Sequence, residues 1–348
     1  MQGEHNAAPS RELPFTFTGS GSEYFRIWIV NTLLTMVTFG IYSAWAKVRT
    51  LQYFYRNTRV DNATFDYHGK PLAILKGRII ALVLFGALQL SGEIHLALPL
   101  VVVLIVAAVM PFLLVRSLRF RLANSSYRGL RFAFRGEDGE GYKVFLLYPL
   151  LAVLTLGILT PFAHQRLKQF QHGRARFGTA PFAFHAPVRA FYRVYVAVSL
   201  MGILLAGGGA VLGALFGTLL GAAAGSTAAA TIAGASVGLW LSFMLAAPLY
   251  RARLQNTVWS ATTLADHRFR STVGTGRLFF VMLTNVILIM LTLGLFLPFA
   301  RVRTTRYCVE SMTLLAAGPL DHFIAAEIDQ VGALGDAAAE WYDIDIAL

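Results

Sequence analysis

A long stretch of the chain, from Ser199 to Pro248, contains no Asp, Glu, Lys, Arg or His. About 20 apolar residues cross the hydrocarbon of a bilayer as a helix, so this stretch predicts membrane helices. The whole chain has only 14% charged residues, whereas soluble domains carry about 25%. The sequence therefore predicts an integral membrane protein rather than a soluble enzyme. We expect about seven apolar membrane segments, at 26–46, 77–90, 94–115, 143–163, 191–215, 228–250 and 278–300.

The sequence also excludes several classes of function. Residues 1–24 are polar, so no cleaved signal peptide is expected at this end. Cys308 is the single cysteine, which rules out a disulfide or a cysteine metal site within one chain. The eight histidines form no HExxH spacing, and the chain has no phosphate-binding glycine loop. We therefore predict no enzyme activity, no catalytic residue, no cofactor and no metal site.

The net charge of +12 would suit a nucleic-acid-binding protein. The Lys and Arg residues, however, flank the apolar segments, where basic loops meet anionic lipid. We expect membrane lipid as a partner and no nucleic acid, and the small-molecule ligand stays unknown.

Repeated motifs are the second strong feature of the chain. Three stretches end alike: TFGIYSAWAKVR at 38–49, TLGILTPFAHQR at 155–166 and TLGLFLPFARVR at 292–303. Two more, PFLLVR at 111–116 and PLYRAR at 248–253, share only the second half. Each stretch ends in a matching arginine: Arg49, Arg116, Arg166, Arg253 and Arg303. Twenty residues after the aromatic or Leu position of the motif, a phenylalanine recurs in four cases: Phe65, Phe132, Phe182 and Phe269.

The spacing of the prolines predicts a larger unit. Pro111 and Pro248 are 137 residues apart, as are Pro161 and Pro298. Two tandem copies of a three-segment unit would produce this spacing, with the first segment as a partial third copy. The expected division is a polar segment at 1–25, a partial repeat at 26–76, repeat units at 77–190 and 191–310, and an acidic tail at 311–348.

Short alternating aromatic motifs lie between the apolar segments, as in Phe15-x-Phe17-x-Gly19 and Phe65-x-Tyr67-x-Gly69. Alternation followed by glycine indicates a short strand that ends in a turn. The expected fold class is an all-α membrane protein, a multi-pass helical bundle with internal repeats and short extramembrane β-elements. The acidic end of the chain, WYDIDIAL, either docks on the basic face as a strand or stays solvated.

Two arrangements in the membrane are open. If the first, fourth and seventh segments enter and return at their Thr-x-Gly breaks, every Lys and Arg lies on one face. If all seven segments cross, the two copies insert with opposite orientation, a plan that transporters use. That second plan places basic loops on both faces, against the positive-inside rule. We favour the one-face arrangement.

Three sets of residues are candidates for contacts. The five matching arginines either anchor at the interface or form a shared face that binds anionic lipid or solute. Asn31 and Asn285 lie within apolar segments and either link helices or coordinate a substrate. The third set is a ridge for close helix packing, against the same chain or a second copy in a homo-oligomer: Gly209, Gly213, Gly217, Gly221 and Gly225.

The motifs from Phe17 to Gly69, the Thr-Leu-Gly segments that run on to Pro-Phe-Ala and Arg, and the acidic alternating C-terminus resemble the YjgN family. The resemblance covers residues 15–348, although Ala44-Trp45 stands where later copies have Pro-Phe. It implies a multi-pass protein of the bacterial inner (plasma) membrane whose activity is unestablished. The function we expect is binding or passing a small solute or lipid, like a transporter. The alternative is a scaffold that binds anionic lipid or partner proteins through its basic face.

Overall fold

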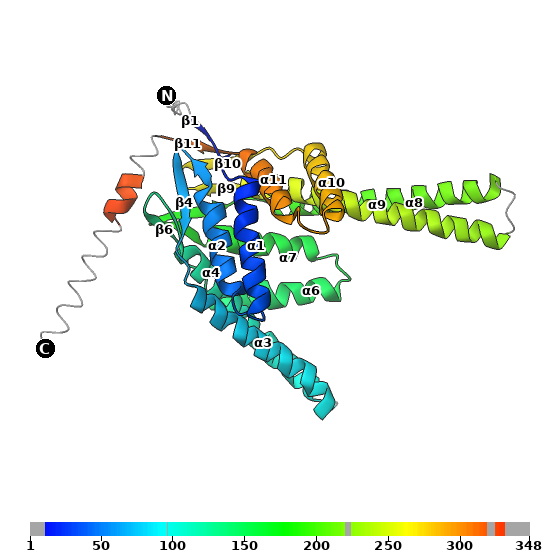
Figure 1. Ribbon diagram of the computed structural model, residues 1–348, viewed down its shortest axis with the longest axis horizontal. Coiled ribbons are helices and arrows are strands. Elements are labelled where there is room, and N and C mark those ends of the chain that lie inside the picture. Colours follow the sequence, from blue (N-terminus) through cyan, green and yellow to red (C-terminus); the bar gives the residue numbers. More distant parts are fainter. Residues whose placement is uncertain (1–10, 96, 220–223, 319–323, 331–348) are drawn as a thin grey trace, which may run out of the picture.

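A computed structural model describes residues 11–95, 97–219, 224–318 and 324–330. Short strands gather at one end of the molecule and helical hairpins extend from them (Figure 1). The strands are β1 (Arg11–Pro14), β2 (Thr16–Phe17), β3 (Thr58–Val60), β4 (Ala63–Tyr67), β5 (Ser125–Tyr127), β6 (Leu130–Phe134), β7 (Ala175–Phe177), β8 (Ala180–Phe184), β9 (Thr262–Leu264), β10 (His267–Ser271) and β11 (Met312–Ala316). The helices are α1 (Gly21–Val37), α2 (Ser43–Arg56), α3 (Pro71–Ile94), α4 (Leu98–Ala123), α5 (Asp138–Tyr142), the π-helix η1 (Lys143–Leu147), α6 (Tyr148–Leu154), α7 (Thr160–Gly173), α8 (Val188–Leu219), α9 (Ala224–Trp259), α10 (Thr275–Leu291) and α11 (Leu297–Glu310).

All the strands belong to one antiparallel sheet that closes on itself. The strand order in the sheet is β1-β11-β10-β9-β8-β7-β6-β5-β4-β3-β2. β1 and β2 are halves of one strand that meet at Phe15, whose backbone N–H donates to the Met312 carbonyl at 3.0 Å. Closure pairs the strand edges that would otherwise invite association with other chains.

The expected all-α class is therefore wrong. The short motifs do form strands, but those strands build one eleven-stranded sheet rather than isolated β-elements. Each strand has only two to five residues, too few for a hydrophobic period to reveal a sheet. Their pairing also joins hairpins far apart in sequence, such as Phe65 with Tyr127, which no local pattern encodes.

The element order repeats five times: an outgoing helix, a return helix and two strands. The return helices are α2, α4, α7, α9 and α11. In the fifth unit the second strand is supplied by the N-terminal strand β1, which pairs with β11. The strand region at 312–316 thus completes the sheet, although the sequence division placed it in the C-terminal tail.

Three of the five helical hairpins are short because the chain turns back at the Thr-x-Gly motif. At the first break Phe39 has φ 49° and Gly40 has φ 90°. A positive φ is a left-handed backbone conformation, which suits glycine because glycine has no Cβ. The same turn recurs at Leu156-Gly157 and at Leu293-Gly294. The helices therefore turn back at the three predicted breaks, as the one-face arrangement requires, and that arrangement in the membrane stays a prediction.

Among the described residues, four helices, rather than seven, are long and apolar enough to cross a membrane: α3, α4, α8 and α9. At 1.5 Å per residue, the 24 residues of α3 extend about 36 Å, more than the hydrocarbon thickness of about 30 Å. The 17 residues of α1 extend only about 26 Å and begin at the sheet.

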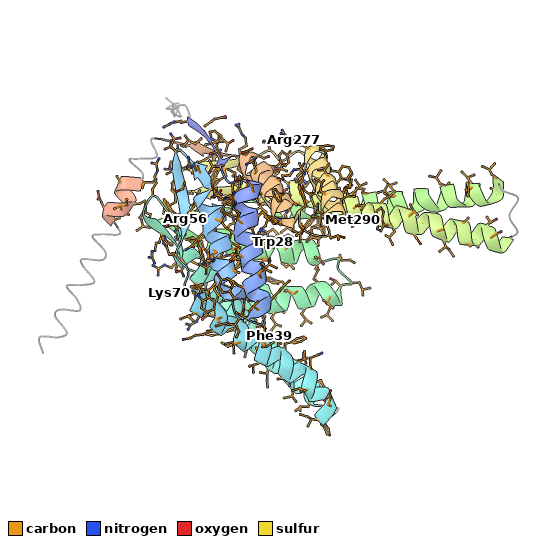
Figure 2. All side chains as sticks on the ribbon, in the orientation of Figure 1. Trp28, Phe39, Arg56, Lys70, Arg277 and Met290 are labelled. Carbon is orange, nitrogen blue, oxygen red and sulfur yellow. The ribbon has the colours of Figure 1, made fainter. Side chains whose placement is uncertain are left out.

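The turns of the short hairpins expose large apolar side chains. Phe39, Leu156 and Leu293 are 98%, 95% and 94% exposed. Figure 2 places Phe39 at the end of α1 away from the strands, whereas Arg56 lies beside them. Such exposed apolar tips are expected in lipid rather than in water. We therefore expect the three short hairpins to enter the bilayer without crossing it.

This arrangement predicts three classes of cysteine accessibility. In a Cys308→Ser background, Asp266→Cys in the β9–β10 turn and Glu93→Cys near the end of α3 should react with an impermeant maleimide from opposite sides. Leu156→Cys should react from neither side, because its tip lies in lipid. All three should react after denaturation. Reaction of Asp266→Cys and Glu93→Cys from the same side would show that α3 and α4 do not cross.

The interior of the closed sheet is filled by aromatic and aliphatic side chains. Five phenylalanines, one per unit, form a closed ring in which neighbouring ring centroids are 6.3–6.5 Å apart. Its members are Phe15, Phe65, Phe132, Phe182 and Phe269. Four of them are the recurring phenylalanines of the sequence motif. Contacts between aromatic rings at this spacing are favourable.

A short helical segment at 324–330 packs against the sheet. Ile324 is 4% exposed and belongs to the core inside the strands. Glu327 accepts hydrogen bonds from the backbone N–H groups of Thr179, at 2.8 Å, and Ala180, at 3.1 Å. These bonds tie the acidic C-terminal region to the β7–β8 turn. The WYDIDIAL end lies outside the described residues.

Candidate anionic-ligand site

Each return helix carries a cation on the flank opposite its matching arginine. We call these five residues the inner cations: Lys47, Arg121, Lys168, Arg251 and Arg301. They lie three, seven or ten residues after the aligned Ala or Pro, positions that share one face of a helix. At the sheet end of this flank, Trp259 and Val309 pack against the barrel core.

Four of the five inner cations are close enough to influence one another. Partial burial lowers the pKa of Lys47, and the positive charges of Arg301, Arg78 and Arg121 lower it further. Burial also lowers the pKa of Lys168, with Arg121 adding to the effect. Within the described ranges no carboxylate forms an ion pair with any inner cation. The cluster is thus a region of uncompensated positive charge.

Two inner cations line a pocket of about 630 Å³ between α1, α9, α10 and α11. Arg301 donates to the Tyr24 hydroxyl at 3.0 Å and lies over the Phe54 ring at 4.9 Å, which fixes its direction. Arg251 is exposed. The rest of the wall is largely apolar and includes Trp28, Met282, Val286, Ile289 and Leu297. The pocket therefore combines two guanidinium groups with an apolar surface.

His164 occupies the matching place on α7 but adds no charge. Its Nδ1 is 3.0 Å from the Tyr195 hydroxyl and 3.1 Å from the Tyr250 hydroxyl. Burial, and then the positive charge of Lys168, lowers the pKa of His164 to about 4. The imidazole is therefore neutral at physiological pH. Among the described residues, no group of three His, Cys, Asp or Glu side chains is arranged to hold a metal ion.

The structure places the five sequence-predicted arginines on the other flank of the return helices, one per unit. Four lie over an aromatic ring, as Arg116 does over Phe112 at 4.9 Å and Arg166 over Phe162 at 5.0 Å. Arg49 and Arg303 lie over rings seven residues earlier. For the fifth arginine, Arg253, the position four residues earlier holds Leu249, which has no aromatic ring. These five side chains are spread around the molecule and do not form one site.

The two asparagines occupy equivalent positions but differ in their contacts. Asn285 donates to the Ala300 carbonyl at 3.2 Å and to Thr304 Oγ1 at 3.0 Å, and accepts from Arg303 at 2.9 Å. It lies in the wall of the pocket, with its amide fully occupied by the protein. Asn31 is 5% exposed, and neither amide atom has a hydrogen-bond partner.

Three of the five predicted ridge glycines lie where α8 meets α9 within the same chain. A Cβ on Gly209 would lie 2.2 Å from the Gly234 carbonyl oxygen, and one on Gly213 would lie 2.2 Å from that of Ala230. A Cβ on Gly217 would approach Thr227 Cα at 3.0 Å. Gly225 faces open space, so the packing predicted for it is absent, and Gly221 lies outside the described residues.

The search for repeated motifs within the sequence missed the inner cations, because they do not all occupy the same position in the five units. Lys47, Arg251 and Arg301 share one repeat position, whereas Lys168 lies four residues later and Arg121 seven residues later. A search for identical positions instead finds the five matching arginines on the opposite flank. We call these the outer arginines: Arg49, Arg116, Arg166, Arg253 and Arg303. A search for any cation on one face of each return helix would have found the inner set.

The closed sheet and the long apolar hairpins that extend from it define a membrane protein with a small strand barrel. The sequence comparisons agree with this class. The chain belongs to a family described as bacterial protein of unknown function (DUF898), which matches residues 12–341.

The relatives include inner membrane protein YjgN of Salmonella typhimurium, 32% identical over 120 residues, and inner membrane protein YjgN of Escherichia coli K12, 32% identical over 127 residues. Each match covers 34% of this chain and 30% of the relative. No solved structure matches the chain. The protein is thus an inner-membrane protein of the YjgN family.

Proposed function

We propose that the protein binds an anionic lipid in the pocket between α1, α9, α10 and α11. The headgroup phosphate contacts Arg251 and Arg301, and the acyl chains lie along the apolar wall. The observation that carries this proposal is the pairing of two guanidinium groups, without carboxylate partners in the described ranges, with an apolar surface in one cavity. Guanidinium groups suit phosphate because they donate two parallel hydrogen bonds.

The location of the pocket favours a lipid over a soluble anion. Its walls include α10 and the start of α11, which flank the exposed apolar turn at Leu293. Met290, labelled in Figure 2, lies at this end of α10 and is 71% exposed. A lipid in the bilayer would therefore reach the pocket from the side.

The filled interior of the strand barrel supports binding rather than passage along the axis. The phenylalanine ring closes on itself inside the sheet, and Ile324 is buried with it in the same core. A solute moving along the axis would have to displace this core. The scaffold alternative draws its support from the outer arginines, which sit on aromatic rings in the way that interfacial anchors do.

Lipid titration in neutral nanodiscs tests the proposal. The protein is placed in phosphatidylcholine discs, and quenching of tryptophan fluorescence by brominated phosphatidylglycerol is followed. Arg251→Gln with Arg301→Gln should weaken the preference for the anionic lipid at least tenfold. Two charge-assisted hydrogen bonds are worth more than the 1.4 kcal/mol or so that a tenfold change represents.

Arg116→Gln with Arg253→Gln is the matched control, since it removes the same charge from the outer flank. This pair should retain the preference. If only the control pair loses the preference for anionic lipid, the lipid binds at the outer arginines. The scaffold alternative then replaces the proposed pocket. Dye flux through vesicles containing the wild-type protein should equal that of empty vesicles, and a clear increase would favour transport.

A further inference from the structure

We propose a second anion-binding site, which takes the phosphate group of a phosphorylated compound, at the junction of α5, η1, α7 and β8. A cavity of about 460 Å³ lies there. Its polar lining includes Glu140, Lys143, Tyr148, Arg166, Arg174 and His185. It shares no lining residue with the lipid pocket, and its place beside the strands sets it apart from the apolar tips.

The cavity has a surplus of positive charge. Glu140 is the single carboxylate among its lining residues, and Arg174 already pairs with it, with Nε donating to Oε2 at 2.9 Å. Lys143 and Arg166 have no ion pair with a carboxylate in the part of the chain that the structure describes. Lys143 and Arg166 thus line the same cavity, and no carboxylate of the described residues balances their charge.

Comparison with the fifth unit shows that Arg166 lacks the protein partners its counterpart has. Arg303 donates to Asn285 Oδ1 at 2.9 Å and to Thr284 Oγ1 at 3.2 Å on its own outgoing helix. In the third unit the aligned residues are Tyr148 and Leu147, and the Tyr148 ring packs on Phe162 instead. The guanidinium of Arg166 therefore has no amide to bind on that helix.

One donor of Arg166 is left unused. Its Nη1 donates to Gln169 Oε1 at 2.9 Å, while its Nε is buried without a hydrogen-bond partner. A buried donor with no acceptor is unfavourable. An oxyanion in the cavity would supply the missing acceptor once the guanidinium turns toward it, and that gain would favour its binding.

The backbone of the third unit is also altered at this place. Its outgoing helix is interrupted by the π-helix Lys143–Leu147, the single π-helix in the described chain. Such wide turns are frequently found at functional sites. Lys143, the first residue of η1, lines the cavity together with Val144. The interruption and the cavity therefore coincide.

The lining identifies the class of ligand. A guanidinium and an ammonium recognise phosphate oxygens. The cavity also has an apolar wall of Val144, Phe170 and Phe184, with room for an organic group. The shared chemistry is a phosphate ester, which reaches the site either as a soluble compound or as the headgroup of a lipid.

The test uses the full chain in phosphatidylcholine nanodiscs. Glycerol 3-phosphate is titrated calorimetrically at constant ionic strength, and phosphatidylglycerol discs form a second arm. Arg166→Gln and, separately, Lys143→Gln should each weaken binding about tenfold. Lys143 is exposed, so its variant keeps the fold if Arg166→Gln does not. Arg116→Gln, which alters the matching arginine of the second unit, should leave binding unchanged.

Binding of glycerol 3-phosphate identifies a soluble ligand, whereas a variant-sensitive response in phosphatidylglycerol discs alone identifies a lipid headgroup. The proposal is overturned if neither probe binds, or if Lys143→Gln binds both probes as the wild type does. Arg251→Gln with Arg301→Gln should leave this site intact. The lipid pocket and the phosphate site can therefore fail independently.

Discussion

Replacing Phe269 by alanine will lower the free energy of unfolding by about 3–5 kcal/mol, the range measured for loss of a buried phenylalanine. Phe269 is 8% exposed and contacts Phe15 and Phe182 at centroid distances of 6.5 and 6.3 Å. Its ring also meets Trp259 edge-on at 5.4 Å. The substitution opens the phenylalanine ring and leaves a cavity that the short surrounding strands cannot fill.

The matched control is Phe39→Ala, the same chemical change at a side chain that is 98% exposed. Its effect on unfolding in detergent should stay below about 0.5 kcal/mol, as for surface sites without special contacts. Unfolding midpoints of both variants in mixed detergent micelles, followed by near-ultraviolet circular dichroism, provide the comparison. Similar losses for the two variants would mean that the ring does not hold the barrel together.

The sequence predicts the components of this barrel better than their assembly. Recurrence after each motif identifies four of the ring phenylalanines, and the Thr-x-Gly motif identifies the turns at Gly40, Gly157 and Gly294. Both signals are local, because a positive φ or an inward-facing ring recurs at one position in each unit. Closure at Phe15 is a contact between the two ends of the chain, and no local pattern reports it.

The number of crossing segments shows a second limit of sequence reasoning. Hydropathy alone cannot distinguish one helix of about 20 residues from a helix that turns back halfway. The first segment, 26–46, has the length of a spanning helix, yet α1 ends at Val37 and α2 begins at Ser43. Two other features of the sequence indicate that the helix turns back. These are the Thr-x-Gly motif and the absence of Lys and Arg from the stretches 91–94 and 206–236.

The candidate sites were the least predictable part. Arg166 was recognised as a repeated residue, but its exceptional surroundings depend on Tyr148, which replaces the asparagine of the first and fifth units. Repeat comparison emphasises what the units share. A site that arises because one unit departs from the others, as the π-helix at Lys143 does, is visible only when the units are superposed in space.

Alanine at both Gly209 and Gly213 will separate the long α8–α9 hairpin and destabilise the protein by several kcal/mol. At each position the new Cβ would lie 2.2 Å from a carbonyl oxygen of the facing helix, so the backbones must move apart. Overpacking of a tight contact typically costs about 1–3 kcal/mol per site. Close approach through small residues is a main source of helix association in lipid, where burial of apolar surface adds little.

Gly207 and Gly208 supply a control within the same helix, because a Cβ at either position meets nothing within 4 Å. Alanine there should be neutral or stabilising, by up to about 1 kcal/mol per residue, since glycine is a poor helix former. The two double variants should therefore shift the unfolding midpoint in SDS titrations in opposite directions. A parallel shift would show that helix propensity, rather than contact with α9, decides the stability of the hairpin. Opposite shifts assign the role of the glycines to packing within one chain, so that no second copy is needed to explain them.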